Sequence, residues 1–412
     1  MSERTIEAEI VAIGGRGDGI AETDEGRFYV PYTVPGDRLS LTVRGGEVVD
    51  ARRTADGKSR HAPVCGHFGT CGGCALQHVE DGAYSEWKRQ RVAETLARRG
   101  LDIEVAPPVR IAPGTRRRVR LGVRATAKGI VLGFKARRSH WLVDVTECPV
   151  ARPQIVALLT PLRSVLSDCL SSGAVAEVSV TVAEGGLDVA VDTSSALDLG
   201  MRERLADFAA TEDLARLAWG GELVVQRGSP RMAFAGIAVH LPPDGFLQPT
   251  EEGAAALADI IVAALDPAAR VADLFAGCGA FSLPLAIRGK RVRALDADNA
   301  QISALHAAAQ NPSLGARLMA EARDLERRPL VGSELAALDG IVLDPPRAGA
   351  AAQIREIAAM AIPVVAYASC NPATFARDAR TLVDGGYRLD SVTPIDQFVW
   401  STEVELAAVF RR

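Results

Sequence analysis

The chain has 412 residues, of which 48% are apolar and 24% charged, and its formal net charge is −4. These values are close to the average for globular proteins, and no stretch approaches the ~18 unbroken apolar residues that a membrane span needs. The composition therefore excludes a membrane-spanning helix and predicts a globular protein of two or three domains. The first ten residues carry charges where a signal peptide has an apolar core, so we expect a cytoplasmic protein in a reducing compartment.

The charges are unevenly distributed along the chain. Residues 52–140 contain 19 Lys or Arg against 7 Asp or Glu, an excess of +12, so the remainder is strongly acidic. Arginine and lysine are concentrated in residues 52–60, 88–99 and 116–138. Most charge runs are ordinary solvated surface, but basic runs confined to one part of an acidic chain favour a surface that neutralises phosphates. We therefore expect a nucleic-acid partner.

Three regions differ in their secondary-structure pattern. Residues 1–57 contain short alternating strands separated by glycine-rich turns, which is typical of a small, OB-like β-barrel. Residues 58–240 begin with a cysteine-containing loop, continue with a helix over 81–99 and then show antiparallel strands, so we expect a central mixed β domain; residues 80–105 can also pack on the next domain. Residues 241–412 alternate helices and strands, which predicts a doubly wound, Rossmann-like sheet with its chemistry at the strand C-termini. The predicted fold class is multidomain, α+β and α/β.

Seven cysteines lie at positions 65, 71, 74, 148, 169, 278 and 370. A disulfide framework is not expected in a reducing compartment, so clustered cysteines favour metal binding or catalysis. The spacing Cys65-x5-Cys71-x2-Cys74, with Cys148 far downstream, supplies four thiolates. Zinc and an iron–sulfur cluster both accept four sulfurs, and the spacing alone does not choose between them. Cys169 and Cys278 are interpreted as packing residues.

Motifs at the ends of the C-terminal strands indicate a ligand crevice. Residues 271–279, VADLFAGCG, form a strand that runs into a turn with Gly277 and Gly279, a pattern compatible with NAD, a nucleotide or S-adenosylmethionine. Asp296 ends the next strand, where a carboxylate suits ribose hydroxyls. Asp344 opens the sequence DPPR after another strand and resembles the active-site loop of class I methyltransferases. Cys370 follows a buried strand, at the crevice edge.

The order of these motifs is recognisable as a whole. DLFAGCG, DPPRAG, ASCNPATFARD and FVWSTEVE together resemble the RNA uracil-C5 methyltransferase family, in particular its branch with an N-terminal TRAM barrel and an iron–sulfur cluster, typified by 23S ribosomal RNA 5-methyluridine enzymes. The resemblance covers nearly the whole chain. It implies a TRAM-like RNA-binding barrel in 1–57, a cluster-bearing domain in 58–240 and an S-adenosylmethionine-dependent methyltransferase domain in 241–412. It further implies a monomer that methylates a uridine of 23S rRNA, with tRNA as the alternative.

The same resemblance implies roles for individual residues. Cys370 would be the nucleophile that adds to C6 of uracil, because this addition makes C5 electron-rich enough to accept a methyl group. Glu405 would be the base that then removes the C5 proton. A [4Fe–4S] cluster would be held by the four spaced cysteines. The implied cofactor-binding residues are Gln248, Phe275, Gly277, Gly279, Asp296, Asp324 and Asp344.

The sequence departs from the family pattern at three positions. Thr250 replaces the usual asparagine, Ala280 stands where a polar residue is frequent, and Glu403 replaces a histidine. These departures leave open a different class of protein, a cluster-bearing RNA-binding protein whose catalytic site has decayed. A methyltransferase acting on an amine is a further alternative, but it would carry an aromatic residue where Arg347 follows the two prolines.

Overall fold

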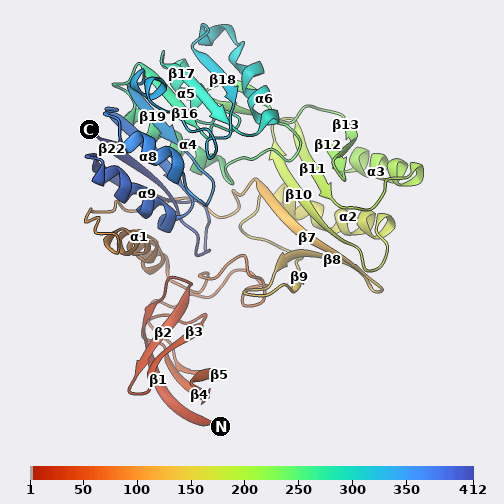
Figure 1. Ribbon diagram of the computed structural model, residues 1–412. Coiled ribbons are helices and arrows are strands. Elements are labelled where there is room, and N and C mark those ends of the chain that lie inside the picture. Colours follow the sequence, from red (N-terminus) through yellow and green to blue (C-terminus); the bar gives the residue numbers. More distant parts are fainter. Residues whose placement is uncertain (1–2) are drawn as a thin grey trace.

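The computed structural model describes residues 3–412 and contains three main β-sheets (Figure 1). The N-terminal sheet is an antiparallel half-barrel with the strand order β3-β2-β1-β4-β5. Alternate side chains of its strands point inward, so that Ile10, Leu39 and Leu41 form a small core. Its strands are β1 (Arg4–Ile13), β2 (Asp18–Thr23), β3 (Gly26–Pro31), β4 (Arg38–Arg44) and β5 (Glu47–Ala55).

A linking segment runs from the half-barrel to the C-terminal unit. It contains the cysteine loop and then helix α1 (Asp81–Ala97), which packs against α9 (Pro372–Asp384) and β21 (Arg388–Asp396). Strand β6 (Val109–Arg110) then pairs in parallel with β21. In Figure 1, α1 accordingly lies between the half-barrel and the C-terminal unit.

The central unit is a seven-stranded sheet with the order β13-β12-β11-β10-β7-β8-β9. Helices α2 (Pro153–Cys169) and α3 (Leu199–Thr211) pack against it, and Leu158, Val178 and Trp219 belong to the shared core. The strands are β7 (Arg118–Thr126), β8 (Gly129–Lys135), β9 (Leu142–Asp144), β10 (Val175–Ala183), β11 (Gly186–Asp192), β12 (Leu214–Trp219) and β13 (Glu222–Gln226). The hairpin β14 (Arg231–Phe234) and β15 (Ile237–His240) instead packs into the core of the C-terminal unit through Met232 and Val239.

The C-terminal unit is a Rossmann-like sheet with the order β18-β17-β16-β19-β20-β22-β21-β6. Five consecutive strands of this order, β18 to β20, are parallel, and β22 is inserted antiparallel between β20 and β21. The strand order reverses at β16, which pairs with both β17 and β19, and ligands of open α/β sheets bind at this kind of switch point. The remaining elements are α4 (Glu251–Ala264), β16 (Arg270–Leu274), α5 (Ser282–Ile287), β17 (Arg291–Asp296), α6 (Asn299–Ala309), β18 (Leu318–Ala322), α7 (Ser333–Ala336), β19 (Gly340–Leu343), α8 (Ala351–Ala358), β20 (Val364–Ser369) and β22 (Glu405–Arg411).

Helices cover both faces of this sheet and separate two apolar cores. One core contains Leu257 of α4 and Leu305 of α6, and the other contains Ile354 of α8 and Phe375 of α9. The predicted central β unit and Rossmann-like C-terminal unit are thus confirmed, whereas the N-terminal strands form a half-barrel where a small OB-like barrel was expected. The metal cluster of the central unit stays a prediction. Across residues 3–412, no helix is both long and apolar enough to cross a membrane.

Candidate active site

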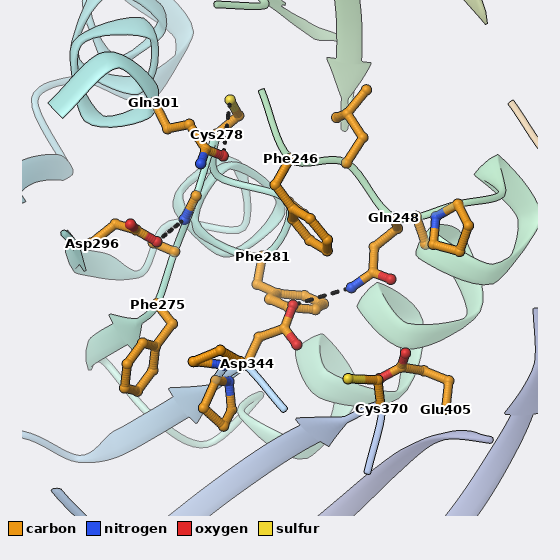
Figure 2. Close-up of a pocket in the computed structure, with 18 of the residues that line it drawn as sticks. Phe246, Gln248, Phe275, Cys278, Phe281, Asp296, Gln301, Asp344, Cys370 and Glu405 are labelled. Atoms are coloured by element: carbon orange, nitrogen blue, oxygen red, sulfur yellow. Dashed lines mark hydrogen bonds between the residues drawn. The ribbon is translucent and has the colours of Figure 1, made fainter. Parts of the chain in front are cut away.

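A cavity of about 720 Å³ opens at the C-terminal ends of β16, β17, β19 and β20 (Figure 2). This is the position at which the alternating helix and strand pattern places a ligand. Of the predicted cofactor-binding and catalytic residues, those that line the cavity are Gln248, Phe275, Gly277, Asp296, Asp324, Asp344, Cys370 and Glu405.

The turn after β16 holds one side of the cavity. Phe275 has φ 64°, Gly277 φ 52° and Gly279 φ 92°, so the backbone curls back on itself in the left-handed region. The Gly277 N–H donates to Asp296 Oδ2 at 2.9 Å, which ties the turn to the end of β17 (Figure 2). Gly279 does not line the cavity; a Cβ there would lie 2.4 Å from Leu305 Cδ1. Gly279 therefore allows α6 to pack closely against the turn.

Two carboxylates lie on the adenosine side that the sequence predicted. Asp296 accepts hydrogen bonds from the backbone N–H groups of Gly277 and Asp298, at 2.9 and 2.8 Å. Asp324 accepts from the backbone of Glu326 at 3.0 Å, so its own loop fixes its orientation. Both carboxylates carry acceptor oxygens at the cavity wall, where ribose hydroxyls and an adenine amino group would find partners.

Asp344 is half-buried directly after β19 and lies opposite Gln248. Gln248 Nε2 donates to Asp344 Oδ2 at 3.1 Å (Figure 2). Burial raises the pKa of Asp344 to about 7, and the charge of Asp296 acts in the same direction, while the Gln248 hydrogen bond opposes them. At neutral pH this carboxyl group is therefore close to its titration midpoint.

Cys370 lies between β20 and α9 and faces the cavity. Pro372 occupies the first helical turn of α9 and Asn371 caps the helix, its side chain accepting from Ala373 N at 3.1 Å. Burial raises the pKa of the Cys370 thiol to about 11, reinforced by the negative charges of Glu405 and Asp344. The thiol of the free protein therefore holds its proton at neutral pH.

Glu405 is the first residue of β22 and is buried. Gln397 Nε2 donates to Glu405 Oε2 at 3.0 Å, whereas Glu405 Oε1 has no hydrogen-bond partner within residues 3–412. Burial, followed by the charge of Asp344, raises the pKa of Glu405 well above its ordinary value. Figure 2 shows the Glu405 carboxyl group next to the Cys370 thiol.

The loop 397–404, which leads to Glu405, is held by residues far away in the sequence. The Trp400 N–H donates to Tyr84 Oη at 2.8 Å, and the Trp400 carbonyl accepts from Ala75 N and Leu76 N at 2.8 and 2.9 Å. Lys88 Nζ donates to the carbonyl oxygens of Phe398 and Glu403. Sequence reasoning missed these positioning residues because nothing in the local pattern of α1 distinguishes a side chain that binds this loop.

The three departures from the family pattern have identifiable structural roles. The Thr250 side chain accepts from Gly253 N at 3.1 Å and so caps α4, as an asparagine would. Ala280 lines the cavity without adding a polar group. Glu403 forms an ion pair with Arg347 at the rim. None of them blocks the cavity.

The arginine run after residue 115 acts partly inside the protein. Arg117 is buried and its Nε donates to the Gln248 carbonyl at 3.1 Å, and burial lowers its pKa to about 10. Arg118 and Arg120 form ion pairs with Asp244 at 2.8 and 2.5 Å. The expectation that this whole run contacts phosphates is therefore wrong for Arg117, whose guanidinium supports the cavity wall instead.

The four spaced cysteines lie in one neighbourhood. Burial raises the pKa of Cys74 to about 12, and the charges of Cys148, Cys71 and Cys65 add to the effect. The loop that carries them is tied to the central sheet, since Gly72 N donates to the Lys135 carbonyl at 2.9 Å. Within residues 3–412, no three metal-ligating side chains are close enough together to hold a single ion.

Comparisons with known proteins identify relatives over nearly the whole chain. Residues 236–412 match the family model of tRNA (uracil-5-)-methyltransferases. A protein of Mesorhizobium japonicum named as an uncharacterized RNA methyltransferase is 43% identical over 96% of both chains. A 23S rRNA (uracil(1939)-C(5))-methyltransferase, RlmD, of Halomonas elongata is 35% identical over 98% of this chain and 89% of its own.

A solved structure shares the fold. The tRNA (uracil-54, C5)-methyltransferase of Pyrococcus abyssi, in complex with S-adenosyl-L-homocysteine, superposes with a TM-score of 0.77 over 98% of this chain and 99% of its own, at 23% identity. The sheet order and the cavity define a class I methyltransferase. The family model and the relatives that span nearly the whole chain show that it belongs to the RNA uracil-C5 methyltransferase family. The protein is therefore an S-adenosylmethionine-dependent RNA (uracil-C5)-methyltransferase.

Proposed function

We propose that this enzyme methylates C5 of a uridine in 23S ribosomal RNA, with Cys370 as the nucleophile and Glu405 as the base. The observation that carries the proposal is that the Cys370 thiol and the buried Glu405 carboxyl group line the same cavity as the carboxylates on the adenosine side. A nucleophile, a base and a methyl donor must all reach one pyrimidine ring, and this cavity brings their sites together.

The residues present fit S-adenosylmethionine. The Gly277 turn leaves a cradle, because a Cβ there would come within 3.1 Å of Gln301 Oε1, and Asp296 offers acceptor oxygens beside it. Bound in this cavity, S-adenosylmethionine supplies an electrophilic methyl group. Gln248 and Asp344 lie between the adenosine side and Cys370, where they would orient the reacting groups.

The proposed reaction balances with this chain's own groups. The Cys370 thiol gives its proton to water at the open cavity and its sulfur bonds to C6, while the electrons of the C5–C6 double bond move toward C5 and the O4 carbonyl. Attack by C5 on the methyl group would leave S-adenosylhomocysteine as the second product. After C5 has taken the methyl group, the Glu405 carboxylate accepts the C5 proton. The electrons left at C5 restore the double bond and expel the thiolate from C6.

Access to C6 requires the uridine to leave its base stack, which costs a few kcal/mol. Basic side chains outside the cavity would hold the distorted RNA by its phosphates. The ribosomal target is favoured because the 35% identical relative that spans nearly the whole chain is named for 23S rRNA. Transfer RNA is the alternative, favoured by the name of the similar archaeal structure.

Trapping tests the chemistry directly. Fluorine at C5 cannot be removed as a proton, so RNA with 5-fluorouridine and S-adenosylmethionine should leave a covalent complex at Cys370. Cys370→Ala should form no complex, whereas Cys169→Ala, which changes a buried cysteine of the central unit, should react normally. Methylation of uridine by Cys370→Ala would refute the proposed nucleophile. Comparing unmodified 23S rRNA and tRNA transcripts as substrates identifies the target.

We also propose that Cys65, Cys71, Cys74 and Cys148 hold a [4Fe–4S] cluster. Cys65, Cys71 and Cys148 lie near enough to Cys74 for their charges to raise the pKa of its thiol, and four cysteine thiolates suit iron–sulfur ligation. The cluster would tie the cysteine loop in place. Iron and acid-labile sulfide should be found in anaerobically purified protein; stoichiometric zinc would refute the cluster.

A further inference from the structure

Gln397, at the end of β21, joins the two halves of the active site. It is fully buried, and its Nε2 donates both to Gln248 Oε1 at 2.8 Å and to Glu405 Oε2 at 3.0 Å. Gln248 in turn donates to Asp344 at 3.1 Å (Figure 2). A continuous chain of hydrogen bonds thus runs from Asp344 through two glutamines to Glu405.

A primary amide suits this position. Gln248 and Glu405 both present oxygen acceptors, so residue 397 must supply two N–H groups from one nitrogen. A carboxylate would offer no donor, and an apolar side chain would leave both Glu405 oxygens without a partner inside the protein. An unsatisfied buried carboxylate is costly, and it is also free to rotate away from the reacting carbon.

The surroundings are shaped to admit this side chain. A Cβ on Gly253 of α4 would lie 2.6 Å from Gln397 Oε1 and 2.9 Å from Gln397 Cβ. Both separations are below any tolerated contact, so the glycine is needed for Gln397 to occupy its place. A Cβ there would also lie 2.6 Å from Thr250 Oγ1, so Gly253→Ala should displace Gln397 and disturb the Thr250 cap of α4 as well.

We propose that Gln397 is a positioning residue that aims the Glu405 carboxylate at the C5 proton and aligns it with the cofactor side through Gln248. The inference rests on the proposed function, in which Glu405 is the base. Gln397 acts after methyl transfer, when the C5 proton moves to Glu405 and the Cys370–C6 bond breaks. Gln248 keeps its hydrogen bond to Asp344 without Gln397, so cofactor binding should be largely independent of this residue.

The charge around Glu405 predicts a pH signature. The groups that face it are Asp344 after β19, Cys370 after β20 and Gln397 from β21. The Gln397 N–H favours the ionised form of Glu405, against burial and the charge of Asp344. Removing this donor should raise the pKa of Glu405, and adding a carboxylate should raise it more. The acid limb of the kcat profile should therefore move to higher pH in the order wild type, Gln397→Met, Gln397→Glu.

The test uses full-length protein, S-adenosylmethionine and uridine-containing 23S rRNA and tRNA transcripts. Gln397→Met should lower kcat roughly 10- to 100-fold, with the KM for S-adenosylmethionine little changed, because base catalysis is impaired while binding is not. Methylated RNA should accumulate on Cys370 as a denaturation-resistant adduct. Gly253→Ala should give the same adduct in smaller amount.

Gln353→Met is the matched control, since Gln353 of α8 is equally buried and bonds only to the backbone of Leu330, at 2.8 and 3.1 Å. It should lower stability without changing the adduct or the pH profile. The inference is overturned if Gln397→Met lowers kcat with no adduct and an unmoved acid limb, even where stability falls. A wild-type enzyme that forms no Cys370 adduct with 5-fluorouridine RNA would instead refute the proposed function.

Discussion

Lys88 of α1 and Asp396 of β21 form an ion pair with an Nζ–Oδ1 distance of 3.2 Å, and both side chains are 1% exposed. Tyr84, one helical turn before Lys88, donates its hydroxyl to the same Asp396 oxygen at 2.8 Å. The linking helix is therefore joined to the C-terminal sheet by buried polar groups. The same lysine holds the carbonyls of Phe398 and Glu403, so this junction lies directly beside the loop that leads to Glu405.

Replacing Lys88 should reduce stability through the loss of its ion pair with Asp396, and activity through the loss of its hydrogen bonds to the loop that leads to Glu405. Lys88→Met removes the closer of two cations from the buried Asp396 carboxylate and leaves Arg110 Nε at 3.6 Å from Oδ2, so it should cost about 1 to 3 kcal/mol in the free energy of unfolding. Adding Asp396→Asn removes the buried carboxylate charge that has lost its closer partner and should restore part of this loss. The loop carbonyls would still lack their donor, so methylation by the double variant should stay slow.

Urea unfolding and initial methylation rates check this prediction. Arg98→Met changes an exposed cation at the end of α1, whose Glu94 partner is also exposed, and serves as the control that should alter neither quantity appreciably. Full activity in the Lys88→Met/Asp396→Asn variant would show that the lysine does not position the loop.

Two glycines of the C-terminal unit allow the stability cost of backbone strain to be measured separately from the cost of a steric clash. Gly279 and Gly289 have φ values of 92° and 88°, but only at Gly279 would a Cβ collide, 2.4 Å from Leu305 Cδ1. Gly289→Ala should cost about 1 to 2 kcal/mol from the left-handed backbone alone. Gly279→Ala should cost about 1 to 3 kcal/mol more, because α6 must move. Equal losses in urea unfolding would mean that Leu305 yields freely.

The site residues at the C-terminal ends of parallel strands could be predicted from the sequence. Gly277, Asp296, Asp344 and Cys370 each lie at or just beyond the C-terminal end of a strand of the doubly wound pattern, and the carboxyl ends of parallel strands meet at one edge. Topology alone therefore predicts their proximity. Glu405 is different, because it begins a strand that runs antiparallel, and only the family resemblance indicated it.

The supporting interactions could not be read from the sequence. Gln397 is separated from Gln248 by 149 positions, and Lys88 from Glu403 by 315, so no local pattern connects either pair. Arg117 looked like its neighbours in a basic run, yet burial against the Gln248 carbonyl gives it a structural role. Which member of a charged run points inward depends on strand register, and in β7 that register is set by pairing with β10.

Metal removal should loosen the loop that leads to Glu405. The cysteine loop ends at Cys74, and the next two backbone N–H groups hold the Trp400 carbonyl. If the proposed cluster orders this loop, Cys74→Ser should lose iron and increase hydrogen exchange in residues 75–76 and 397–404. Strand β18, on the opposite edge of the sheet, is the internal control and should exchange as in the wild type. Unchanged exchange in residues 397–404 would contradict the coupling.

The buried carboxyl of Asp344 should make cofactor affinity depend on pH. Its pKa is raised to about 7 by burial, so it is largely protonated at pH 6 and largely ionised at pH 8. The sulfonium of S-adenosylmethionine is a cation and favours the ionised carboxylate. Binding must therefore drive off a proton at low pH, and affinity should rise roughly tenfold from pH 6 to pH 8. Calorimetric titration across this range, in buffers of different ionisation enthalpy, measures both the affinity and the proton released.

A second carboxyl group, on Asp273, provides a control that tests whether Asp344 causes the pH dependence of cofactor affinity. Burial also raises the pKa of Asp273 to about 7, but this side chain accepts a 2.5 Å hydrogen bond from Ser282 and does not line the cavity. Asp344→Asn should weaken binding at pH 8 and flatten the pH dependence, because no charge remains to be formed. Asp273→Asn should keep the dependence, since Asp344, the carboxylate proposed to face the sulfonium, is still present. If Asp273→Asn flattens the profile and Asp344→Asn does not, the titrating group has been assigned to the wrong carboxyl.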